Sequence, residues 1–147
     1  MDERIERALA ITPQSSASAR TIDITTTGAR TGRKRRIEIW FYRVDGEIYL
    51  TTQPAVRSWY ANLRANPEFT FHLTHGVRAD LRARAERVPD PADRRRVFAA
   101  IIADLNQPRH SAYIAQPVES LEQWMRGSPL MRVRFDDDAQ RRREDQP

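Results

Sequence analysis

The residue types best suited to chemistry gather in two segments, a basic turn at residues 27–36 and an aromatic segment at residues 58–67. The basic turn holds five positive side chains within residues 29–36, and Gly28 and Gly32 bracket it. Such side chains hold phosphate or carboxylate groups through charge-assisted hydrogen bonds. A solvated hairpin turn in an arginine-rich chain has the same composition, so the turn alone supports both interpretations.

The aromatic segment contains Trp59, Tyr60 and Asn62 and follows a strand break at Pro54. The start of a helix attracts anions because its first N–H groups have no partner, and the face of Trp59 can cover a flat heteroaromatic ring. Asn62 lies on a neighbouring part of the same helix surface. Packing in a core explains the two aromatic residues equally well. Together, the two segments favour an anionic ligand that carries a ring.

Histidine and tyrosine supply the remaining candidates for proton transfer. His72 and His75 lie three residues apart, a spacing that places them on opposite faces of a strand. No third ligand is near them in the sequence, so we predict no metal site. His110 and Tyr113 fall in a proline-containing loop, residues 106–117, of a kind that can cover an active site and donate a proton. Because no catalytic Ser-His-Asp or Cys-His arrangement is recognisable, an enzyme of this sequence would rely on a cofactor.

Length and composition limit the class of protein. The chain has 147 residues, no cysteine, a formal charge of +5 and a pI of about 10.4. This length fits one domain with its own core, and the lack of cysteine excludes disulfides and thiolate metal sites. No apolar run approaches the roughly 20 residues that cross a bilayer. Residues 1–7 do not resemble a signal peptide. We therefore expect a cytoplasmic protein with an anionic partner.

The periodicity of the sequence predicts the elements that position these residues. Alternating or β-branched segments predict six strands, at residues 21–27, 36–44, 47–53, 68–74, 78–88 and 130–135. The pair Asp45-Gly46 predicts a type I′ hairpin between the second and third strands. Helical patterns predict a weak amphipathic helix near the N-terminus and helices at residues 56–66, 91–105 and 118–126.

This order of elements favours a mainly β protein with helices, of α+β class, built as a small β-barrel of about six mostly antiparallel strands with peripheral helices. No Gly-x-Gly-x-x-Gly motif is present, which disfavours a doubly wound dinucleotide-binding sheet. We expect a helix and a flexible segment at residues 1–20 and the barrel domain at residues 21–135. Residues 136–147 are charged and poor in apolar side chains, which predicts a disordered tail.

Two motifs in this frame resemble the deazaflavin-dependent nitroreductase family. The first comprises residues 25–28 (Thr-Thr-Thr-Gly), 30–32 (Arg-Thr-Gly) and Arg35. The second is the more specific and comprises residues 59–67, Trp-Tyr-x-Asn-Leu-x-Ala-Asn-Pro, downstream of the Asp45-Gly46 hairpin. The resemblance runs from about residue 21 to residue 88 and continues collinearly to residue 135. Members of this family are small split β-barrels related in fold to the flavin-binding pyridoxamine-phosphate oxidases.

The resemblance implies an oxidoreductase that passes a hydride from reduced coenzyme F420 to a flat acceptor, either a quinone or a nitroaromatic compound. The positions that match the family's basic turn, and that would bind the anionic tail of the cofactor, are Arg30, Thr31, Arg33, Lys34 and Arg35. The positions that match the region beside the ring system are Thr51, Thr52, Gln53, Arg57, Trp59 and Asn62. Tyr113 is the counterpart of a late tyrosine near the acceptor and is our candidate proton donor.

Two departures from the family pattern leave other ligands open. Residues 52–58 form a shorter stretch than in the family and contain no glycine, so they offer fewer free N–H groups to a phosphate. Glu38 stands where the family tends to have proline. One alternative is a split barrel that binds FMN, whose phosphate suits the same basic site. Another is a non-enzymatic barrel that binds lipid, haem or another hydrophobic ligand.

The partners expected are therefore a small-molecule acceptor and no nucleic acid. Lys34 is the only lysine among 25 basic residues, a bias that reflects the base composition of a genome and weakens the link between high pI and nucleic acid. Basic residues and aromatic residues also do not alternate along one strand face as they do in RNA-binding sheets. The apolar strand faces are compatible with barrel closure and with a homodimer.

Overall fold

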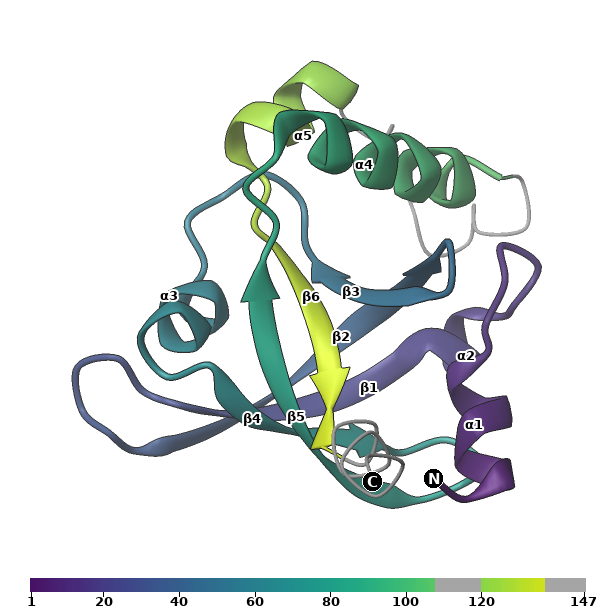
Figure 1. Ribbon diagram of the computed structural model, residues 1–147, viewed down its shortest axis with the longest axis vertical. Coiled ribbons are helices and arrows are strands. Elements are labelled where there is room, and N and C mark those ends of the chain that lie inside the picture. Colours follow the sequence, from purple (N-terminus) through teal and green to yellow (C-terminus); the bar gives the residue numbers. More distant parts are fainter. Residues whose placement is uncertain (108–119, 137–147) are drawn as a thin grey trace, which may run out of the picture.

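The computed structural model of the protein describes residues 1–107 and 120–136. In this part of the chain six strands form a closed barrel in the order β1-β2-β3-β6-β5-β4, and all neighbouring strands are antiparallel (Figure 1). The strands are β1 (Thr21–Thr27), β2 (Lys34–Val44), β3 (Glu47–Thr51), β4 (Glu68–Leu73), β5 (Ala79–Arg87) and β6 (Leu130–Phe135). The predicted α+β class and the predicted antiparallel barrel are thus confirmed.

Alternation of apolar and polar residues closes the barrel around a single interior. Ile22 and Ile24 on β1 are fully buried, whereas their chain neighbours are partly exposed. Phe71 lies near the middle of this interior, with edge-to-face contacts to Phe41 at 5.4 Å and to Phe135 at 5.3 Å between ring centroids. Such contacts add to the stabilisation from buried area.

The hairpin between β2 and β3 has the predicted geometry. Asp45 and Gly46 both have positive φ, at 51° and 78°, as a type I′ turn requires. Val44 and Glu47 form the pair next to the turn, and Phe41 is paired with Leu50. This register places Tyr42 and Tyr49 together on the outer face of the barrel.

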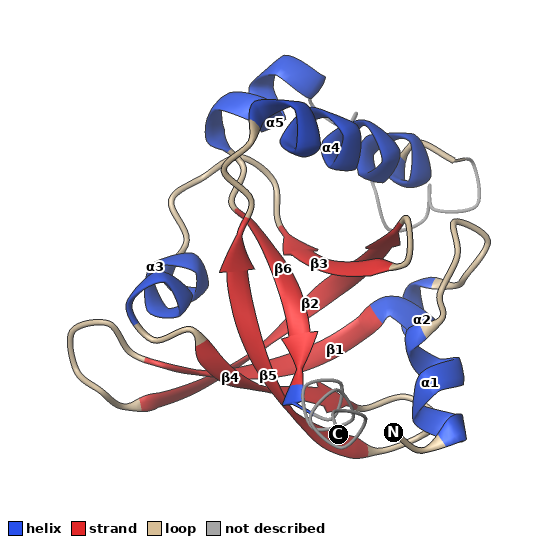
Figure 2. Ribbon diagram, in the orientation of Figure 1, coloured by secondary structure: helices blue, strands red, loops and turns tan. Residues whose placement is uncertain are grey.

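Five helices of the described chain surround the barrel (Figure 2). They are α1 (Glu3–Leu9), α2 (Ala17–Arg20), α3 (Ser58–Ala65), α4 (Pro91–Leu105) and α5 (Leu121–Gly127). Helices α1 and α2 lie on the opposite side of the barrel from α3, and α4 packs beside α5. None of these helices has the length and apolar composition needed to cross a bilayer.

Helices α4 and α5 cover a second core on the outer face of β2 and β3. Tyr42 and Tyr49 pack there with Phe98 of α4 and Trp124 of α5, and the last two rings meet edge to face at 5.8 Å. This core explains why β2 carries large apolar side chains on both faces.

The structure also differs from the prediction in several places. Helix α2 lies within the stretch expected to be a flexible connection. Helix α3 begins at Ser58, two residues later than predicted, because Val56 is fully exposed and offers no apolar contact to a helix. The third strand ends at Thr51 instead of Gln53. His72 alternates with Phe71 and Leu73 in the sequence, which predicts a solvated outer face, but its side chain is only 7% exposed. The tail predicted to be disordered lies, beyond Asp136, outside the described residues.

Candidate functional site

The basic turn projects beyond the barrel at the end where α3 lies (Figure 1). Its backbone is closed by two hydrogen bonds, from Gly28 N–H to the Arg33 carbonyl at 2.8 Å and from Gly32 N–H to the Gly28 carbonyl at 3.0 Å. Gly32 has φ of +68°, in the left-handed region that favours glycine. The Thr31 hydroxyl accepts a further bond from Arg33 N–H at 3.2 Å. The turn therefore has a defined shape.

The positive charges of this turn are not neutralised by neighbouring carboxylates. Arg30, Arg33 and Arg35 are exposed and form no ion pair with any described residue. The Lys34 ammonium donates to the Thr27 hydroxyl at 2.8 Å, which leaves its charge uncompensated. Arg36 differs, because its guanidinium pairs with Asp23 at 2.8 Å. Four of the five cations thus form a local excess of positive charge, which is suited to an anion.

Asn62 of α3 and Asn66, which follows the last residue of the helix, connect it to the basic turn. Asn62 is only 8% exposed, and its Oδ1 accepts a hydrogen bond from Ala29 N–H at 3.0 Å. Its Nδ2 donates to the Thr26 hydroxyl at 3.1 Å. Asn66 donates from Nδ2 to the Thr27 carbonyl at 3.3 Å. Both polar atoms of Asn62 therefore have partners within the protein, whereas the sequence predicts a direct contact with the cofactor.

Strand β2 has an open edge next to this turn. Residues 34–40 pair with β1 on one side, but only residues 41–44 pair with β3 on the other. Because Leu50 is opposite Phe41, the chain leaves β3 where the open edge begins. An unpaired strand edge presents backbone N–H and C=O groups that a ligand can use.

The segment that leaves β3 carries buried polar atoms without partners. Thr52 Oγ1, Arg57 Nε and Trp59 Nε1 are buried, and none has a hydrogen-bond partner in the described structure. Buried polar groups are normally paired, so three unpaired donors in one short segment need an explanation, and a bound ligand would supply one. Thr51 is different, because its hydroxyl donates to the Pro129 carbonyl at 2.5 Å and is only 2% exposed.

Comparison with known families identifies the family of this chain. Residues 12–117 match the model of the F420H(2)-dependent quinone reductase family. The chain belongs to this family. It is an F420-dependent oxidoreductase, and reduced F420 is its cofactor, as the two motifs had indicated. No curated protein matches the chain.

Solved structures show the same split-barrel fold. A conserved hypothetical protein from Mycobacterium tuberculosis is 24% identical, with a TM-score of 0.60 over 92% of this chain and 84% of that one. A putative 5-nitroimidazole antibiotic resistance protein from Bacteroides thetaiotaomicron is 16% identical, with a TM-score of 0.57 over 92% and 81%. A protein described as an F420 reductase is 18% identical, with a TM-score of 0.56 over 79% and 86%.

The residues present in this F420H(2)-dependent reductase fit an anionic cofactor with a polar ring. The fit rests on the uncompensated cations of the basic turn and on the buried, unpartnered polar atoms after β3. Not all of the predicted residues have polar groups that are free to bind the cofactor. The hydroxyl of Thr51 and the amide of Asn62 are used within the protein. Gln53 is exposed, and its carbonyl accepts from the Arg57 guanidinium at 3.3 Å.

Trp59 does not offer the stacking surface that the sequence suggested. Its side chain is only 5% exposed and belongs to the barrel core, with Tyr60 edge to face at 5.9 Å. The packing interpretation therefore holds for the indole ring, and only its Nε1–H lacks a partner. The signal for this burial was present in the sequence, because a tryptophan next to a leucine-containing helix face is commonly in a core.

The candidates for proton transfer fall into two groups. His110 and Tyr113 lie outside the described residues. His72 lies within them, on the outer face of the barrel, where Nε2 is 2.7 Å from Thr25 Oγ1 and Nδ1 is 2.7 Å from Asp80 Oδ1. This chain of hydrogen bonds joins β1, β4 and β5 and was missed by sequence reasoning. Within residues 1–107 and 120–136, no group of three or more His, Cys, Asp or Glu could hold a metal ion.

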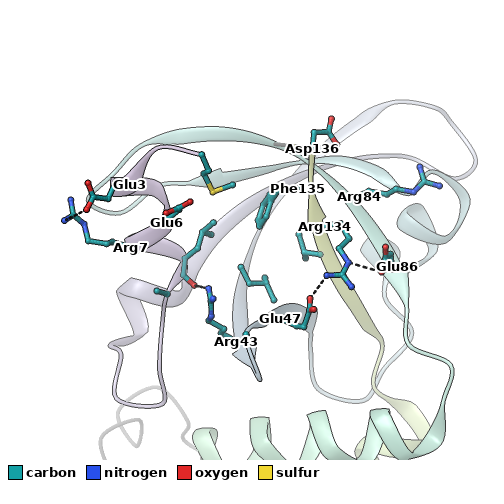
Figure 3. A pocket seen from close by; sticks show the side chains of 16 residues that line it. Glu3, Glu6, Arg7, Arg43, Glu47, Arg84, Glu86, Arg134, Phe135 and Asp136 are labelled. Carbon is teal, nitrogen blue, oxygen red and sulfur yellow. Dashed lines mark hydrogen bonds and ion pairs between the residues drawn. The ribbon is translucent and has the colours of Figure 1, made fainter. Parts of the chain in front are cut away.

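A pocket of about 850 Å³ lies away from the candidate site, between α1 and strands β3, β5 and β6 (Figure 3). Leu9 and Phe135 contribute to its apolar lining. Arg134 lies between Glu47 and Glu86, at 2.7 and 3.3 Å, as Figure 3 shows. Because two carboxylates compensate the charge of Arg134, the pocket has less to offer an anionic tail than the basic turn has. The predicted cofactor-binding residues do not line it.

Proposed function

We propose that the protein transfers a hydride from reduced F420 to a quinone-type acceptor, with the cofactor's anionic tail on the basic turn and its ring system beside the open edge of β2. The description of the family supports a quinone in preference to a nitroaromatic acceptor. The observation that carries the assignment of the site is the uncompensated positive charge next to an unpaired strand edge.

The proposed role of the basic turn is electrostatic. Arg30, Arg33 and Arg35 extend from a backbone that is already closed by hydrogen bonds, so little ordering is needed when they bind phosphate or carboxylate oxygens. Planar guanidinium groups suit these oxygens because they donate in pairs. Lys34 adds charge but directs one of its three protons to Thr27.

The proposed role of the segment after β3 is to meet the ring system. The Thr52 hydroxyl and the Trp59 indole N–H are buried donors without partners in the described structure, and they would hydrogen-bond to polar atoms at the edge of the ring. The Arg57 Nε–H is a third such donor. These groups would fix the orientation of the ring against β2, which contributes to catalysis by proximity and alignment.

The reaction needs one proton in addition to the hydride. When bound, the reduced cofactor supplies the hydride, and with one proton this converts a quinone to a hydroquinone. We assign the proton to Tyr113 as a proposal from the family motif, since a phenol within reach of the developing oxyanion stabilises it and can protonate it.

Titration of the purified protein with F420, followed by cofactor fluorescence, tests the proposed site. Replacement of Arg30, Arg33 and Arg35 by glutamine is expected to raise the Kd by at least about tenfold, since each charge-assisted bond contributes roughly 1 kcal/mol or more. The matched control replaces three exposed arginines elsewhere, Arg82, Arg87 and Arg126, by glutamine, and it should leave the Kd within about twofold.

A parallel titration with FMN and a steady-state assay complete the test. Saturable binding of F420, with a steep dependence on the three turn arginines, supports the proposal. An equal loss of affinity in both triple variants would overturn the assignment of the tail to the basic turn. Binding of FMN but not F420 would contradict the cofactor. A higher kcat/KM for nitroaromatic compounds than for quinones would contradict the acceptor.

A further inference from the structure

We infer that Asn62 is a positioning residue, which acts by holding the basic turn in its anion-binding shape from helix α3. This inference rests on the proposed function of the turn. Asn62 lies in the aromatic motif, but its amide reaches away from solvent and toward the start of the turn. The side chain therefore links the two segments that the sequence singled out.

The contacts of Asn62 join the basic turn to strand β1. Its Oδ1 accepts from the N–H of Ala29, an exposed residue within the turn, at 3.0 Å. Its Nδ2 donates at 3.1 Å to the hydroxyl of Thr26, which is 2% exposed and lies on the barrel strand that leads into the turn. One amide thus ties an exposed segment to a buried strand, with α3 as the support.

A second asparagine reinforces this link. Asn66, one helical turn after Asn62, donates from Nδ2 to the Thr27 carbonyl at 3.3 Å. The two side chains therefore contact the backbone or hydroxyl groups of three residues, Thr26, Thr27 and Ala29, at the point where β1 becomes the turn. Asn62 is the more buried of the two and is the one that reaches past Gly28 into the turn itself.

The turn needs an external support because of its own composition. Four uncompensated cations lie between Arg30 and Arg35, and like charges at this spacing repel one another. Two glycines in the same turn add conformational freedom to the unbound chain. Without the Asn62 bond, part of the binding free energy of an anion would be spent on ordering the turn. We therefore place the effect of Asn62 on affinity and not on the chemical step.

The main test compares Asn62→Ala with Thr26→Val. Asn62→Ala removes both hydrogen bonds, including the tether to Ala29. Thr26→Val keeps the shape of the side chain at position 26 and the hydrogen bond between Asn62 and Ala29, but it removes the hydroxyl that accepts from Asn62 Nδ2. It is therefore the control for an effect that comes from loss of stability alone. We expect Asn62→Ala to raise the Kd for F420 about fivefold to tenfold, as for loss of one hydrogen bond. Thr26→Val should leave the Kd within about twofold.

Two further readouts separate positioning from a general structural role. Hydrogen exchange of the Ala29 amide, measured without cofactor, should become faster in Asn62→Ala and stay unchanged in Thr26→Val. With reduced F420, KM for the cofactor should rise in Asn62→Ala while kcat at saturation is kept, because the reacting ring is not displaced. A fall in kcat with an unchanged KM would overturn the inference.

A second variant covers the case in which Asn62→Ala does not fold. Ala29→Pro removes the same tether from the other end, at an exposed position, because proline has no N–H. It should also raise the Kd for F420. If the wild-type protein binds F420 through the turn arginines but neither variant changes its Kd, the inference on Asn62 is wrong and the proposed function stands. If the wild-type protein does not bind F420, the proposed function itself fails.

Discussion

Arg20 and Asp104 form a buried ion pair, with Nη1 at 2.7 Å from Oδ2, between residues 84 positions apart in the sequence. Arg20 is 1% exposed and also lies 5.9 Å from the ring centroids of Trp40 and Tyr42. Burial raises the pKa of the Tyr42 phenol, and the Arg20 charge opposes this rise. The pair joins the N-terminal segment to α4 over the second core.

Removal of one partner of this pair should destabilise the protein strongly. We expect Arg20→Met to lower the free energy of unfolding by about 3–5 kcal/mol, because the Asp104 carboxylate would lose its buried counter-charge. The double variant Arg20→Met/Asp104→Leu should lose less than the single variant, since it removes both charges of the pair together. Urea unfolding followed by circular dichroism measures both.

An exposed ion pair provides the control for this prediction. Arg95 and Glu122 lie 2.6 Å apart on α4 and α5 with both side chains more than half exposed. Arg95→Ala should change the free energy of unfolding by no more than about 1 kcal/mol. If Arg20→Met costs as little as Arg95→Ala, the Arg20–Asp104 pair does not hold the N-terminal segment as described.

The hydrogen bond from His72 to Asp80 should affect how the free energy of unfolding falls as the pH is lowered. This bond, with a smaller effect of the Arg36 charge, lowers the pKa of the Asp80 carboxyl below its ordinary value of 3.8. A lowered pKa in the folded state stabilises the protein above the unfolded pKa, and that contribution is lost as pH falls through the folded pKa. Asp80→Asn should therefore flatten the loss of stability on acidification.

The measurement is urea unfolding at a series of pH values from about pH 5 downwards. Glu38→Gln is the matched control, because Glu38 is exposed and forms no ion pair with a described residue. The free energy of unfolding of Glu38→Gln should fall with decreasing pH in the same way as that of the wild-type protein. A parallel shift of the whole curve in Asp80→Asn, with no change of slope, would show that the carboxylate does not titrate differently in the folded state.

Thr51 should matter for stability more than for the cofactor. Its hydroxyl donates to the Pro129 carbonyl at 2.5 Å and links the end of β3 to the start of β6. Thr51→Val should lower the free energy of unfolding by about 1–3 kcal/mol, since the buried carbonyl would lose its donor. Thr51→Ser, which keeps the hydroxyl, is the control. A rise in the Kd for F420 without loss of stability would favour the direct contact that the sequence predicts.

Local patterns were sufficient to predict the barrel. Each of these patterns acts within a few residues. Alternation predicts strands β1 and β5, the pair Asp45-Gly46 predicts the hairpin, and the proline after Asn66 predicts the end of a helix, and the structure has each of these elements. In the second strand, Ile39 and Phe41 alternate with Trp40 and Tyr42, which indicates a strand covered on both faces, and the second core covers the face of Tyr42. The ends of helices and strands were predicted less exactly. Whether a residue near an end is buried or exposed, as at Val56, depends on the rest of the fold.

The roles of individual polar residues were less predictable because their partners are distant in the sequence. Asn62 bonds residues 33 and 36 positions away, and Thr51 bonds a carbonyl 78 positions away. An asparagine on a short helix is also compatible with solvent, so its type gave no sign of burial. In a chain with so many arginines, nothing in the sequence distinguished the buried Arg20 from the exposed ones.

The close packing at Gly28 gives a separate test of the shape of the basic turn. A Cβ at this position would lie 2.7 Å from Thr31 Oγ1 and 3.3 Å from the Arg33 carbonyl oxygen. Gly28→Ala should therefore displace the turn and raise the Kd for F420 by roughly tenfold, about 1.4 kcal/mol. The double variant Gly28→Ala/Thr31→Ala removes the closest contact and should recover part of the affinity relative to Gly28→Ala alone.

Gly46→Ala is the matched control for this prediction. Gly46 lies in the β2–β3 hairpin with φ of +78°, and a Cβ there would meet no atom of the described residues within 4 Å, so alanine is strained but does not clash. It should lower the free energy of unfolding by about 1–2 kcal/mol and leave F420 binding unchanged. Equal effects of the two glycine variants on the Kd would mean that affinity follows overall stability. An effect of Gly28→Ala alone would tie affinity to the conformation of the turn.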